Sequence, residues 1–497
     1  MTLSQFSQRL AWSALTVGMM ASRFCQAESW EELKQRGLLR WGADAEGGAP
    51  YVYHDPGNPD RLVGFEAELA DELAKRLGLE ARMAQENWDM LVPALKQGSF
   101  DVILNGLERT PENQQKLDLS RPYFVYAQQI VTRAGSTNIN GLEDLKGGTV
   151  GVLSGSVSHH ILGGRPEIHS KIYLGNAETF RDLKIGRLDA TIVDSPVATQ
   201  FARTDPELRL GGPAFAPGFY AIGVRLGETN LLAKINKALA ELLDDGTLER
   251  IDSKYGLWDT NQLAMRSFQA EAVDRKAQRS ALTAWRRYLP LLLRASVTTI
   301  WLTVAGMALA MSAGLCIALL RLYGPAPGRW LATAYTEVMR GTPLLIQLYF
   351  IYYGLAQQIG LRMSEYTAAV LALGLNYAAN EAENYRAGIN GVPRGQWEAA
   401  SALGMSRWLT IRRIVLPQAF RLVVPPISND FIAMFKDSSI VSVIAIVELT
   451  KEYQIRANDT GDYLGLGLMT AGLYFGMSYA ASLVMQQFEK RLRYDHR

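Results

Sequence analysis

The pattern of apolar and polar positions divides the chain into a mixed first half and a strongly apolar second half. Residues 64–77 repeat apolar side chains at helical spacing, whereas short apolar runs at 38–43, 149–153 and 190–193 predict strands. Strands and helices alternate in this way over residues 28–259, with two successive sets of strands. The pattern therefore predicts a mixed α/β region.

Five later stretches are apolar and long enough to cross a bilayer, which predicts an all-α membrane region of about five helices. They cover residues 295–320, 343–359, 366–385, 419–447 with an interruption, and 463–488. Basic residues gather after the first, third and fifth stretches, at Arg321, between Arg386 and Arg413, and at Lys490. Because positively charged loops stay in the cytoplasm, the first half of the chain is expected outside it.

The first residues have the pattern of a secretory signal. Arg9 precedes the mostly apolar stretch Leu10–Ala21, and Cys25-Gln26-Ala27 supplies a small-x-small ending. A basic residue, an apolar stretch and a small-residue cleavage site are typical of a signal peptide. We therefore expect a signal peptide over residues 1–27, with cleavage after Ala27.

Length and composition bound the number of domains and exclude several functions. A chain of 497 residues is too long for a single core; we expect an exported domain over residues 28–259, a polar linker over 260–287 and a membrane domain over 288–497. The 51 basic residues nearly balance the 49 acidic ones, which argues against binding to nucleic acid. Cys25 and Cys316 offer no disulfide framework, and the sequence predicts no metal ion and no cofactor.

A loop between the third and fourth apolar stretches has a distinctive spacing. Its residues are Glu398, Ala399, Ala400, Gly404, Leu416 and Pro417. The alanines allow a partner to approach closely, Gly404 allows a turn between two helical pieces, and Pro417 suits the start of the next helix. A surface helix that ends at a glycine would share part of this pattern.

The spacing resembles the cytoplasmic coupling loop of the permeases of ABC importers. The resemblance implies that residues 392–416 dock on a separate ATPase subunit. The sequence has no Gly-x4-Gly-Lys-Ser/Thr phosphate loop, so ATP would be hydrolysed by that partner. Two copies of the ATPase would serve two permeases, either a homodimer of this chain or a pair with a different permease.

Motifs in the exported half resemble the polar amino acid binding proteins of ABC importers. They are Leu62-Val63-Gly64-Phe65-Glu66, the run from Trp88 to Leu95, Phe100-Asp101-Val102-Ile103, the run from Asp118 to Tyr123, and the run from Leu142 to Gly147. The resemblance covers residues 28–259. It implies the two-lobed α/β fold of type II periplasmic binding proteins, with a small ligand in the cleft between the lobes.

The resemblance also implies which residues line the cleft. The ligand-binding candidates are Asp44, Trp88, Glu108, Arg109, Asn113, Ser154, Ser156 and Asp194. Relatives hold the α-carboxylate of the ligand with the arginine of a Thr-x-x-Arg element, but here Thr110 is followed by Asn113 at that spacing. A neutral amide cannot replace a bidentate guanidinium. Asp194 is expected to hold the ammonium group of the ligand.

Two interpretations of the missing clamp remain open. Arg109 or Arg121 could reach the cleft instead, or the ligand has no free α-carboxylate. The backbone amides around Ser154-Gly155-Ser156 could also receive an anion. Because three of the cleft candidates are carboxylates, a cationic ligand is favoured. We expect an amino acid or a related small amine.

Polar residues in the membrane half are candidates for the transport path. They are Arg340, Thr342, Glu383, Lys436 and Asp437. Simpler roles are also open: Thr342 suits the start of a helix, and Glu383 can pair with Arg386 one turn away. Lys436 and Asp437 suit a helix break at the boundary of the bilayer.

Together, the resemblances imply an importer subunit of the inner membrane with its binding domain in the periplasm and no bond chemistry of its own. Two other classes share part of the pattern. A ligand-gated receptor or channel can carry the same two-lobed domain, although the loop spacing and the five apolar stretches argue against it. A dehydratase-like exported enzyme would use Glu108 as an acid or base.

Overall fold

The structure is a computed structural model that describes residues 30–45, 48–269 and 281–494. The chain divides into two compact units. The first is Met1–Gln278 with Asn458–Gly461, and the second is Arg279–Ala457 with Asp462–Arg497. The predicted signal peptide, residues 1–27, lies outside the described residues.

The first unit consists of two lobes that share one mixed sheet. Its strands follow the order β4-β1-β5-β11-β6-β9-β7-β8, and β10 pairs with β6. Lobe 1 holds β1 (Leu38–Ala43), β4 (Glu80–Gln85) and β5 (Val102–Ile103), and lobe 2 holds β7 (Thr149–Leu153), β8 (His169–Tyr173), β9 (Ala190–Asp194) and β10 (Leu208–Leu210). The strands predicted at 38–43, 149–153 and 190–193 are confirmed.

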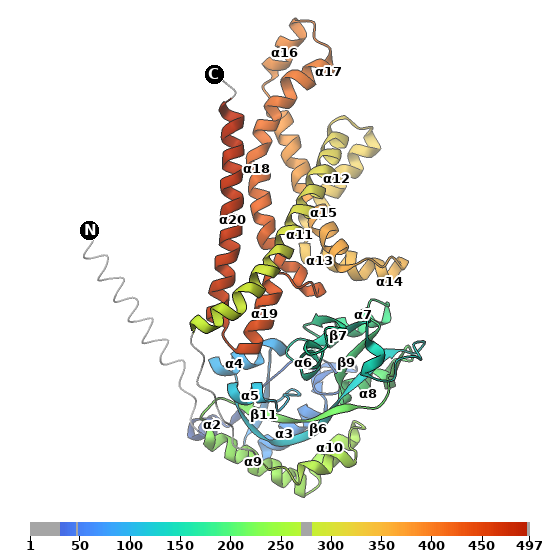
Figure 1. Ribbon diagram of the computed structural model, residues 1–497, viewed down its shortest axis with the longest axis vertical. Helices are drawn as coiled ribbons and strands as arrows, with labels where there is room; N and C mark the ends of the chain where they lie inside the picture. Colours follow the sequence, from blue (N-terminus) through green and yellow to red (C-terminus); the bar gives the residue numbers. More distant parts are fainter. Residues whose placement is uncertain (1–29, 46–47, 270–280, 495–497) are drawn as a thin grey trace, which may run out of the picture. The chain divides into compact units, whose positions relative to one another are not determined.

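Two long antiparallel strands join the lobes. They are β6 (Asp118–Arg133) and β11 (Phe215–Val224). Strand β11 also pairs with β5 of lobe 1, whereas β6 pairs with β9 of lobe 2. Figure 1 shows the two strands side by side. The predicted two-lobed α/β fold is therefore confirmed.

Helices cover both lobes, and a short hairpin extends from lobe 1. The helices of this unit are α2 (Trp30–Arg36), α3 (Phe65–Leu77), η2 (Trp88–Met90), α4 (Leu91–Gln97), α5 (Pro111–Lys116), η3 (Leu142–Leu145), α6 (Val157–Gly163), α7 (Asn176–Lys184), α8 (Ser195–Thr204), α9 (Thr229–Asp244), α10 (Thr247–Lys254) and η4 (Thr260–Met265). The hairpin is β2 (Tyr53–Asp55) with β3 (Asn58–Val63). Lobe 1 packs around Leu95, Phe100 and Ile103, and lobe 2 around Val150 and Ile192.

The first part of the predicted linker belongs to the binding unit. In η4, the side-chain amide of Gln262 accepts a hydrogen bond from Val125 N and donates one to Val125 O, each at 2.8 Å. Met265 is fully buried. The prediction of a linker from residue 260 is therefore wrong at its start, because these contacts hold η4 against β6.

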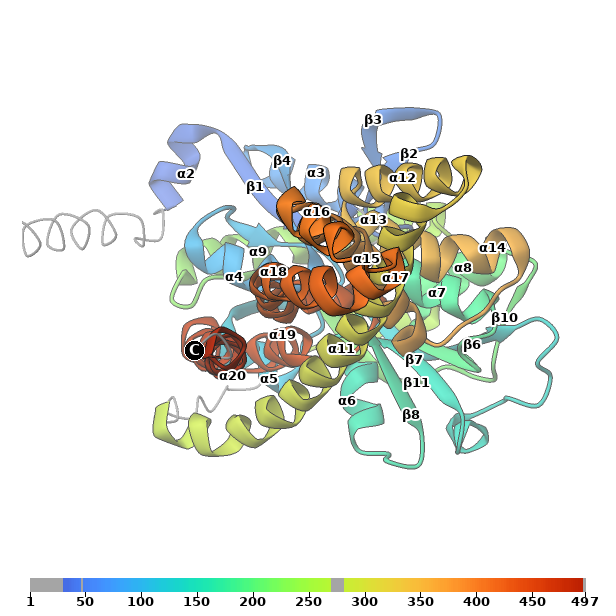
Figure 2. The ribbon, with the colours of Figure 1, turned by 90° about the horizontal axis from the view of Figure 1, so that it is seen from above.

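The second unit is all-helical. Its elements are α11 (Ala281–Tyr323), α12 (Ala326–Gly341), α13 (Leu344–Tyr349), η5 (Phe350–Gly354), α14 (Leu355–Ile359), α15 (Glu365–Asn390), α16 (Arg394–Ala402), α17 (Arg407–Thr410), η6 (Ile411–Val415), α18 (Leu416–Asp437), η7 (Ser438–Ile444), α19 (Leu449–Thr460) and α20 (Tyr463–Tyr494). Helices occupy all five predicted apolar stretches. The view in Figure 2 looks almost along the axis of α20.

Small residues bring α11 and α15 into close contact. A methyl group added at Gly314 would stand 2.7 Å from Glu381 Cβ, and one added at Gly374 would stand 2.6 Å from the side chain of Leu309. Glycine at both positions therefore permits the close packing. The core of this unit includes Tyr352 and Met434.

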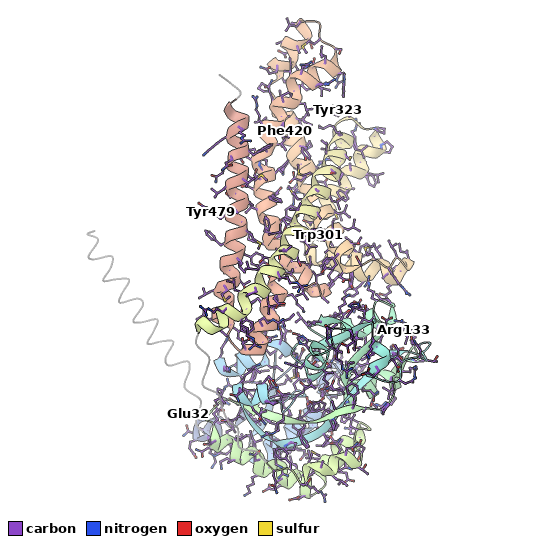
Figure 3. All side chains as sticks on the ribbon, in the orientation of Figure 1. Glu32, Arg133, Trp301, Tyr323, Phe420 and Tyr479 are labelled. Atoms are coloured by element: carbon purple, nitrogen blue, oxygen red, sulfur yellow. The ribbon has the colours of Figure 1, made fainter. Side chains whose placement is uncertain are left out.

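Apolar side chains also project outward from the helices of the second unit. Trp301, Phe420 and Tyr479 are exposed, and Figure 3 labels them. Two described helices are individually long and apolar enough to cross a membrane, Arg286–Tyr323 with mean hydropathy 2.0 and Tyr463–Arg491 with mean hydropathy 1.3. Exposed apolar surface on long helices is what a lipid environment requires.

Glu66 is a fully buried carboxylate in lobe 1. Its Oε1 accepts hydrogen bonds from Tyr123 OH at 2.5 Å and from Gly106 N at 2.6 Å, so α3, β6 and the turn after β5 meet at this group. Burial raises the pKa of Glu66 to about 7, although these hydrogen bonds act in the opposite direction. The charged form of Glu66 therefore opposes folding.

We expect the variant Glu66→Gln to remove a pH dependence of stability. A carboxyl group whose pKa rises from 4.5 to about 7 on folding contributes stability that is complete below pH 4.5 and is lost as the pH rises through 7. Relative to the parent, the variant should gain up to about 3 kcal/mol between pH 5 and pH 8. Urea unfolding of the exported domain measures this, with the exposed Glu80→Gln as control. Parallel pH profiles for parent and variant would contradict the assignment.

Candidate functional site

A cavity lies between the two lobes. It is lined from lobe 1 and the segments after its strands by Asp44, Tyr51, Trp88, Asn105, Gly106 and Glu108, and from lobe 2 by Leu153, Ser156, Ser158, Leu174, Gly175, Asn176, Ile192, Val193, Asp194 and Val197. Five predicted cleft residues are among them: Asp44, Trp88, Glu108, Ser156 and Asp194. Arg109, Asn113 and Ser154 are not.

Glu108 reaches across the cleft from lobe 1 to lobe 2. Both of its carboxylate oxygens accept from Val157 N, the first amide of α6, at 3.0 and 3.1 Å. The side chain is buried. Burial, reinforced by the negative charge of Asp194, raises the pKa of Glu108 well above its usual value.

Asp194 stands at the end of β9, where the sheet register sets its partners. Gln128 on β6 faces it in the ladder and donates from Nε2 to Asp194 Oδ1 at 2.6 Å. Tyr220 on β11 donates to the other oxygen, and its hydroxyl also lies 2.7 Å from Tyr51 OH. Burial raises the pKa of Asp194 to about 6, although the bonds from Tyr220 and Gln128 lower it.

Asp44 forms a third acidic position, on the opposite wall from Asp194. Its Oδ1 accepts from Gln85 Nε2 and its Oδ2 from Trp88 N, both at 3.1 Å, while Asp44 N donates to Asn105 Oδ1. These bonds fix the carboxylate beside the indole of Trp88. The cleft therefore combines carboxylates from both lobes with aromatic and aliphatic walls.

Arg109, predicted to contact the ligand, is held by other groups of the domain. Its Nη1 donates to the carbonyls of Leu119 at 3.1 Å and Ser120 at 2.7 Å, and its guanidinium lies 5.0 Å from the ring centre of Phe268. These contacts turn the side chain away from the cavity. Arg121 is also directed elsewhere, with Nη2 donating to Met265 O at 3.4 Å.

Asn113 and Ser154 are likewise placed by local structure rather than by the cavity. Thr110 caps α5 by accepting from Asn113 N at 3.2 Å, and Asn113 Nδ2 donates to Glu108 O at 2.8 Å. The Thr-x-x-Asn element is thus a helix cap that also fixes the backbone at Glu108. Ser154 is buried, and its amide donates to Tyr173 O.

The amides proposed to receive an anion already have acceptors. Gly155 N donates to His159 Nδ1 at 3.2 Å, and Ser156 N donates to Leu153 O at 3.3 Å. Ser156 caps α6 by accepting from His159 N. With Val157 N bound to Glu108, the start of α6 offers its amides to groups of the protein itself.

In the membrane unit, Glu383 is held in an ion-pair cluster. Arg321 Nη1 lies 3.0 Å from Glu383 Oε2, and Arg386 pairs with both carboxylate oxygens. The contacts match the simpler structural role named above, because two guanidinium groups neutralise the carboxylate. Its place in the transport path is not supported by this geometry.

The other path candidates have different surroundings. Thr342 does not cap a helix start, because Pro343 is the N-cap of α13; the Thr342 hydroxyl donates to Val338 O and accepts from Gln347 Nε2, each at 2.8 Å. Arg340 and Lys436 are exposed. Asp437 ends α18 and accepts from Tyr377 OH at 2.6 Å.

Two carboxylates inside the membrane unit were not among the predicted site residues. Glu381 on α15 is fully buried, and neither of its oxygens has a hydrogen-bond partner within normal distance among the described residues. Asp430 on α18 accepts from Asn384 Nδ2 at 2.9 Å, one turn along α15. Both lie inside predicted apolar stretches, and a carboxylate in such a stretch is itself a signal of function.

The predicted coupling loop forms two short helices joined by a tight turn. Helix α16 ends at Ala402, Gly404 has φ of +71°, and Ser406 caps α17 by accepting from Leu409 N. The predicted turn at Gly404 is confirmed. Of the motif residues, Ala400 is buried, whereas Glu398, Ala399, Gly404, Leu416 and Pro417 are exposed.

Comparison with known proteins gives a match for each unit. Residues 39–257 match the family of bacterial extracellular solute-binding proteins, family 3, and residues 306–494 match the family described as binding-protein-dependent transport system inner membrane component. The chain is 38% identical over 206 residues to the L-cystine transport system permease protein TcyB of Bacillus subtilis, covering 41% of this chain and 88% of the relative.

Relatives of the exported half are separate binding proteins. The chain is 32% identical over 245 residues to the L-cystine-binding protein TcyJ of Escherichia coli K12, covering 49% of this chain and 91% of the relative. Among solved structures, an ancestral arginine-binding protein bound to arginine is 37% identical, with a TM-score of 0.42 over 44% of this chain and 99% of that one.

We expect Arg109→Ala to destabilise the exported domain without weakening its ligand binding. The substitution removes two hydrogen bonds to carbonyls and the contact with Phe268, which should cost about 2 kcal/mol in the free energy of unfolding. Urea unfolding measures this cost. For any compound that stabilises the parent domain, the affinity of Arg109→Ala should stay within about twofold of the parent's affinity. The substitution Asp194→Ala should lower that affinity. A large loss of affinity in Arg109→Ala would restore this arginine as a ligand clamp.

Proposed function

The chain belongs to the binding-protein-dependent ABC importers, with a family 3 solute-binding domain and an inner membrane permease domain in one polypeptide, and from this we propose its function in detail. We propose that it is the substrate-binding and translocating subunit of an importer for amino acids or related small amines. The observation that carries the proposal is the presence, in one chain, of a closed two-lobed cleft and a permease with an exposed coupling loop.

The cleft suits reversible capture of a small solute. Residues of lobe 1 and lobe 2 share the lining, and only β6 and β11 continue from one lobe to the other in the sheet. A ligand that bonds to both walls therefore favours the closed arrangement, because an open cleft cannot offer both sets of contacts at once. The closed domain would then deliver its ligand to the membrane domain.

A separate ATPase would supply the energy. Two large apolar side chains of the coupling loop are mostly exposed: Leu403 has 79% of its surface accessible and Trp408 has 71%. Arg407, Arg412 and Arg413 of the same loop are exposed as well. Exposed apolar and basic side chains on one loop suit docking on a soluble protein. The remainder of the loop is anchored by the buried side chains of Val392, Val415 and Ala419.

The membrane domain would act as a pair. In this arrangement two permease domains enclose one path and two ATPase subunits drive it, and a homodimer is the simplest pairing. The permease family places the chain in the inner membrane with the binding domain outside the cytoplasm. We further propose five spans, formed by α11, the α13-to-α14 segment, α15, α18 and α20, with the binding domain in the periplasm.

The families that match both units are transport families, so we propose no catalytic role for this chain. In an enzyme of the dehydratase type, Glu108 would need to exchange protons with a substrate. Here its carboxylate is bound to Val157 N instead. This contact gives Glu108 a role in joining the lobes and in setting the charge of the cleft.

We expect Gly404→Val to uncouple ATP hydrolysis from uptake. A β-branched residue is strained at φ of +71°, so the turn between α16 and α17 should distort while the rest of the loop keeps its sequence. In proteoliposomes with the ATPase, transport should fall at least about tenfold with ligand binding unchanged. Gly395→Val is the matched control, because its backbone lies outside the left-handed region and a Cβ there meets nothing within 4 Å. Normal uptake by Gly404→Val would remove the support for the coupling loop.

The proposed topology predicts which residues an impermeant thiol reagent reaches in intact cells. In a background with Cys316→Ser, a cysteine at Asn261 in the exposed η4 segment should be labelled, and a cysteine at Arg394 in the coupling loop should not. Permeabilised cells provide the control, since both positions are exposed on the structure and should then react. Labelling of the Arg394 position before permeabilisation would overturn the topology.

A further inference from the structure

We propose that the ligand of the cleft is an organic cation without a carboxylate group, such as an amine, an amidine or a quaternary ammonium compound. This inference rests on the proposed function and narrows its substrate class. It follows from the carboxylates that line the cavity and from the lack of a basic side chain among the described lining residues.

The cavity lacks a receptor for a carboxylate. None of the described residues that line it is an arginine or a lysine. The two nearby arginines that could have replaced the clamp donate to backbone carbonyls instead, Arg109 to Leu119 and Ser120, and Arg121 to Met265. A ligand carboxylate would therefore enter an acidic cavity without a cationic partner.

Glu108 itself fills the place that an anionic group of a ligand would need. Val157 N, the lobe 2 amide that faces the cleft, donates to both oxygens of the Glu108 carboxylate. The neighbouring amides of Gly155 and Ser156 are used by His159 and Leu153. The protein thus carries its own carboxylate where the two lobes meet, and a second one from a ligand would be repelled.

The same cavity offers a strong receptor for a cation. Carboxylates of Asp44, Glu108 and Asp194 line it from both lobes. Each carboxylate oxygen has two acceptor sites, so Asp194, whose oxygens accept from Gln128 and Tyr220, keeps acceptor capacity for a ligand. Tyr51 and Trp88 add aromatic surface that attracts cations.

Repulsion between two carboxylates explains why a cationic ligand would favour closure of the cleft. Glu108 and Asp194 repel one another in the closed cleft, which is one cause of the raised pKa of Glu108. They also interact with Tyr51, Tyr126 and Tyr220, which are neutral near pH 7, and Glu108 with Glu112, whose negative charge adds to the repulsion. A cation between the two carboxylates removes the repulsion, whereas a zwitterion with its own carboxylate restores part of it.

Acidic residues inside the membrane unit also favour a cationic cargo, independently of the cleft. Buried Glu381 and half-buried Asp430 interact as like charges between α15 and α18, and Asp437 lies farther along α18. The described structure gives Glu381 and Asp430 no ion pair with a basic side chain. Carboxylates at such positions need a proton or a cationic group beside them, and a cationic cargo meets this need.

The test compares amino acids with the amines that lack their carboxylate groups, one in the first four pairs and two in cystine. The full chain in detergent is titrated calorimetrically with arginine and agmatine, lysine and cadaverine, histidine and histamine, phenylalanine and phenethylamine, and cystine and cystamine. We expect at least one amine to bind at least about tenfold more tightly than its parent amino acid. Asp194→Asn should weaken that binding about tenfold to a hundredfold, and the exposed Asp60→Asn, outside the cavity, should leave it unchanged.

A reversal variant tests the roles of Glu108 and Asn113 directly. The double substitution Glu108→Thr with Asn113→Arg removes the built-in carboxylate and supplies a guanidinium at the clamp spacing. It should raise the affinity for amino acids at least about tenfold and lower that for amines. Tighter binding of an amino acid than of its amine by the parent chain would overturn the inference but leave the importer assignment intact. Failure of every amine at about 1 mM would also overturn it. The importer assignment is judged separately, by the coupling of uptake to ATP hydrolysis.

Discussion

The acidity of the cleft is the constraint on which the binding domain depends. Glu108 and Asp194 approach from different lobes into one cavity whose described lining holds no basic side chain. Burying carboxylates is costly unless hydrogen bonds or a counter-charge compensate, and the domain supplies the hydrogen bonds from Val157, Gln128 and Tyr220. We propose that the ligand supplies the counter-charge. Affinity, closure and selectivity for charge would then arise from the same groups.

The sheet shared by the two lobes links the acidic cleft to the movement of the lobes. Gln128 and Tyr220 lie on β6 and β11, the two strands that continue between the lobes, so the groups that hold Asp194 belong to the connection rather than to either lobe alone. Tyr220 is also stacked on Tyr126, with ring centres 4.5 Å apart. The Glu108 contact with Val157 joins the two lobes directly, so opening of the cleft would break it.

The membrane unit combines close packing with a few buried polar groups. Gly314 and Gly374 let α11 and α15 approach each other, which buries Glu381 at their contact. Glu383, only two residues away, faces Arg321 and Arg386 and is neutralised. Two neighbouring glutamates on one helix thus have opposite environments, since a two-residue step turns the side chain to another face of the helix. The neutralised one suits a structural role, and the uncompensated one suits a role in transport.

The sequence by itself determined the class of this protein. Apolar periodicity predicted the strands at 38–43, 149–153 and 190–193 and helical segments at the five apolar stretches, and short motifs located the cleft and the turn at Gly404. These features depend on residues that are close together in the sequence, so the sequence is sufficient to predict them. The resemblance to amino acid binding proteins also implied an arginine at the position of Asn113, and its absence first raised the question of the ligand's charge.

Only the tertiary structure decided how the cleft is built. Arg109 is adjacent to Glu108 in the chain, yet it faces the carbonyls of Leu119 and Ser120 while Glu108 enters the cavity. Tyr51 and Tyr220 come to the site from distant segments and carried no motif. Likewise, η4 was expected to be a linker because its residues are polar, but the amide of Gln262 pairs with the backbone of Val125. Side-chain direction and long-range pairing depend on sheet register and packing, and these arise only when separate parts of the chain meet.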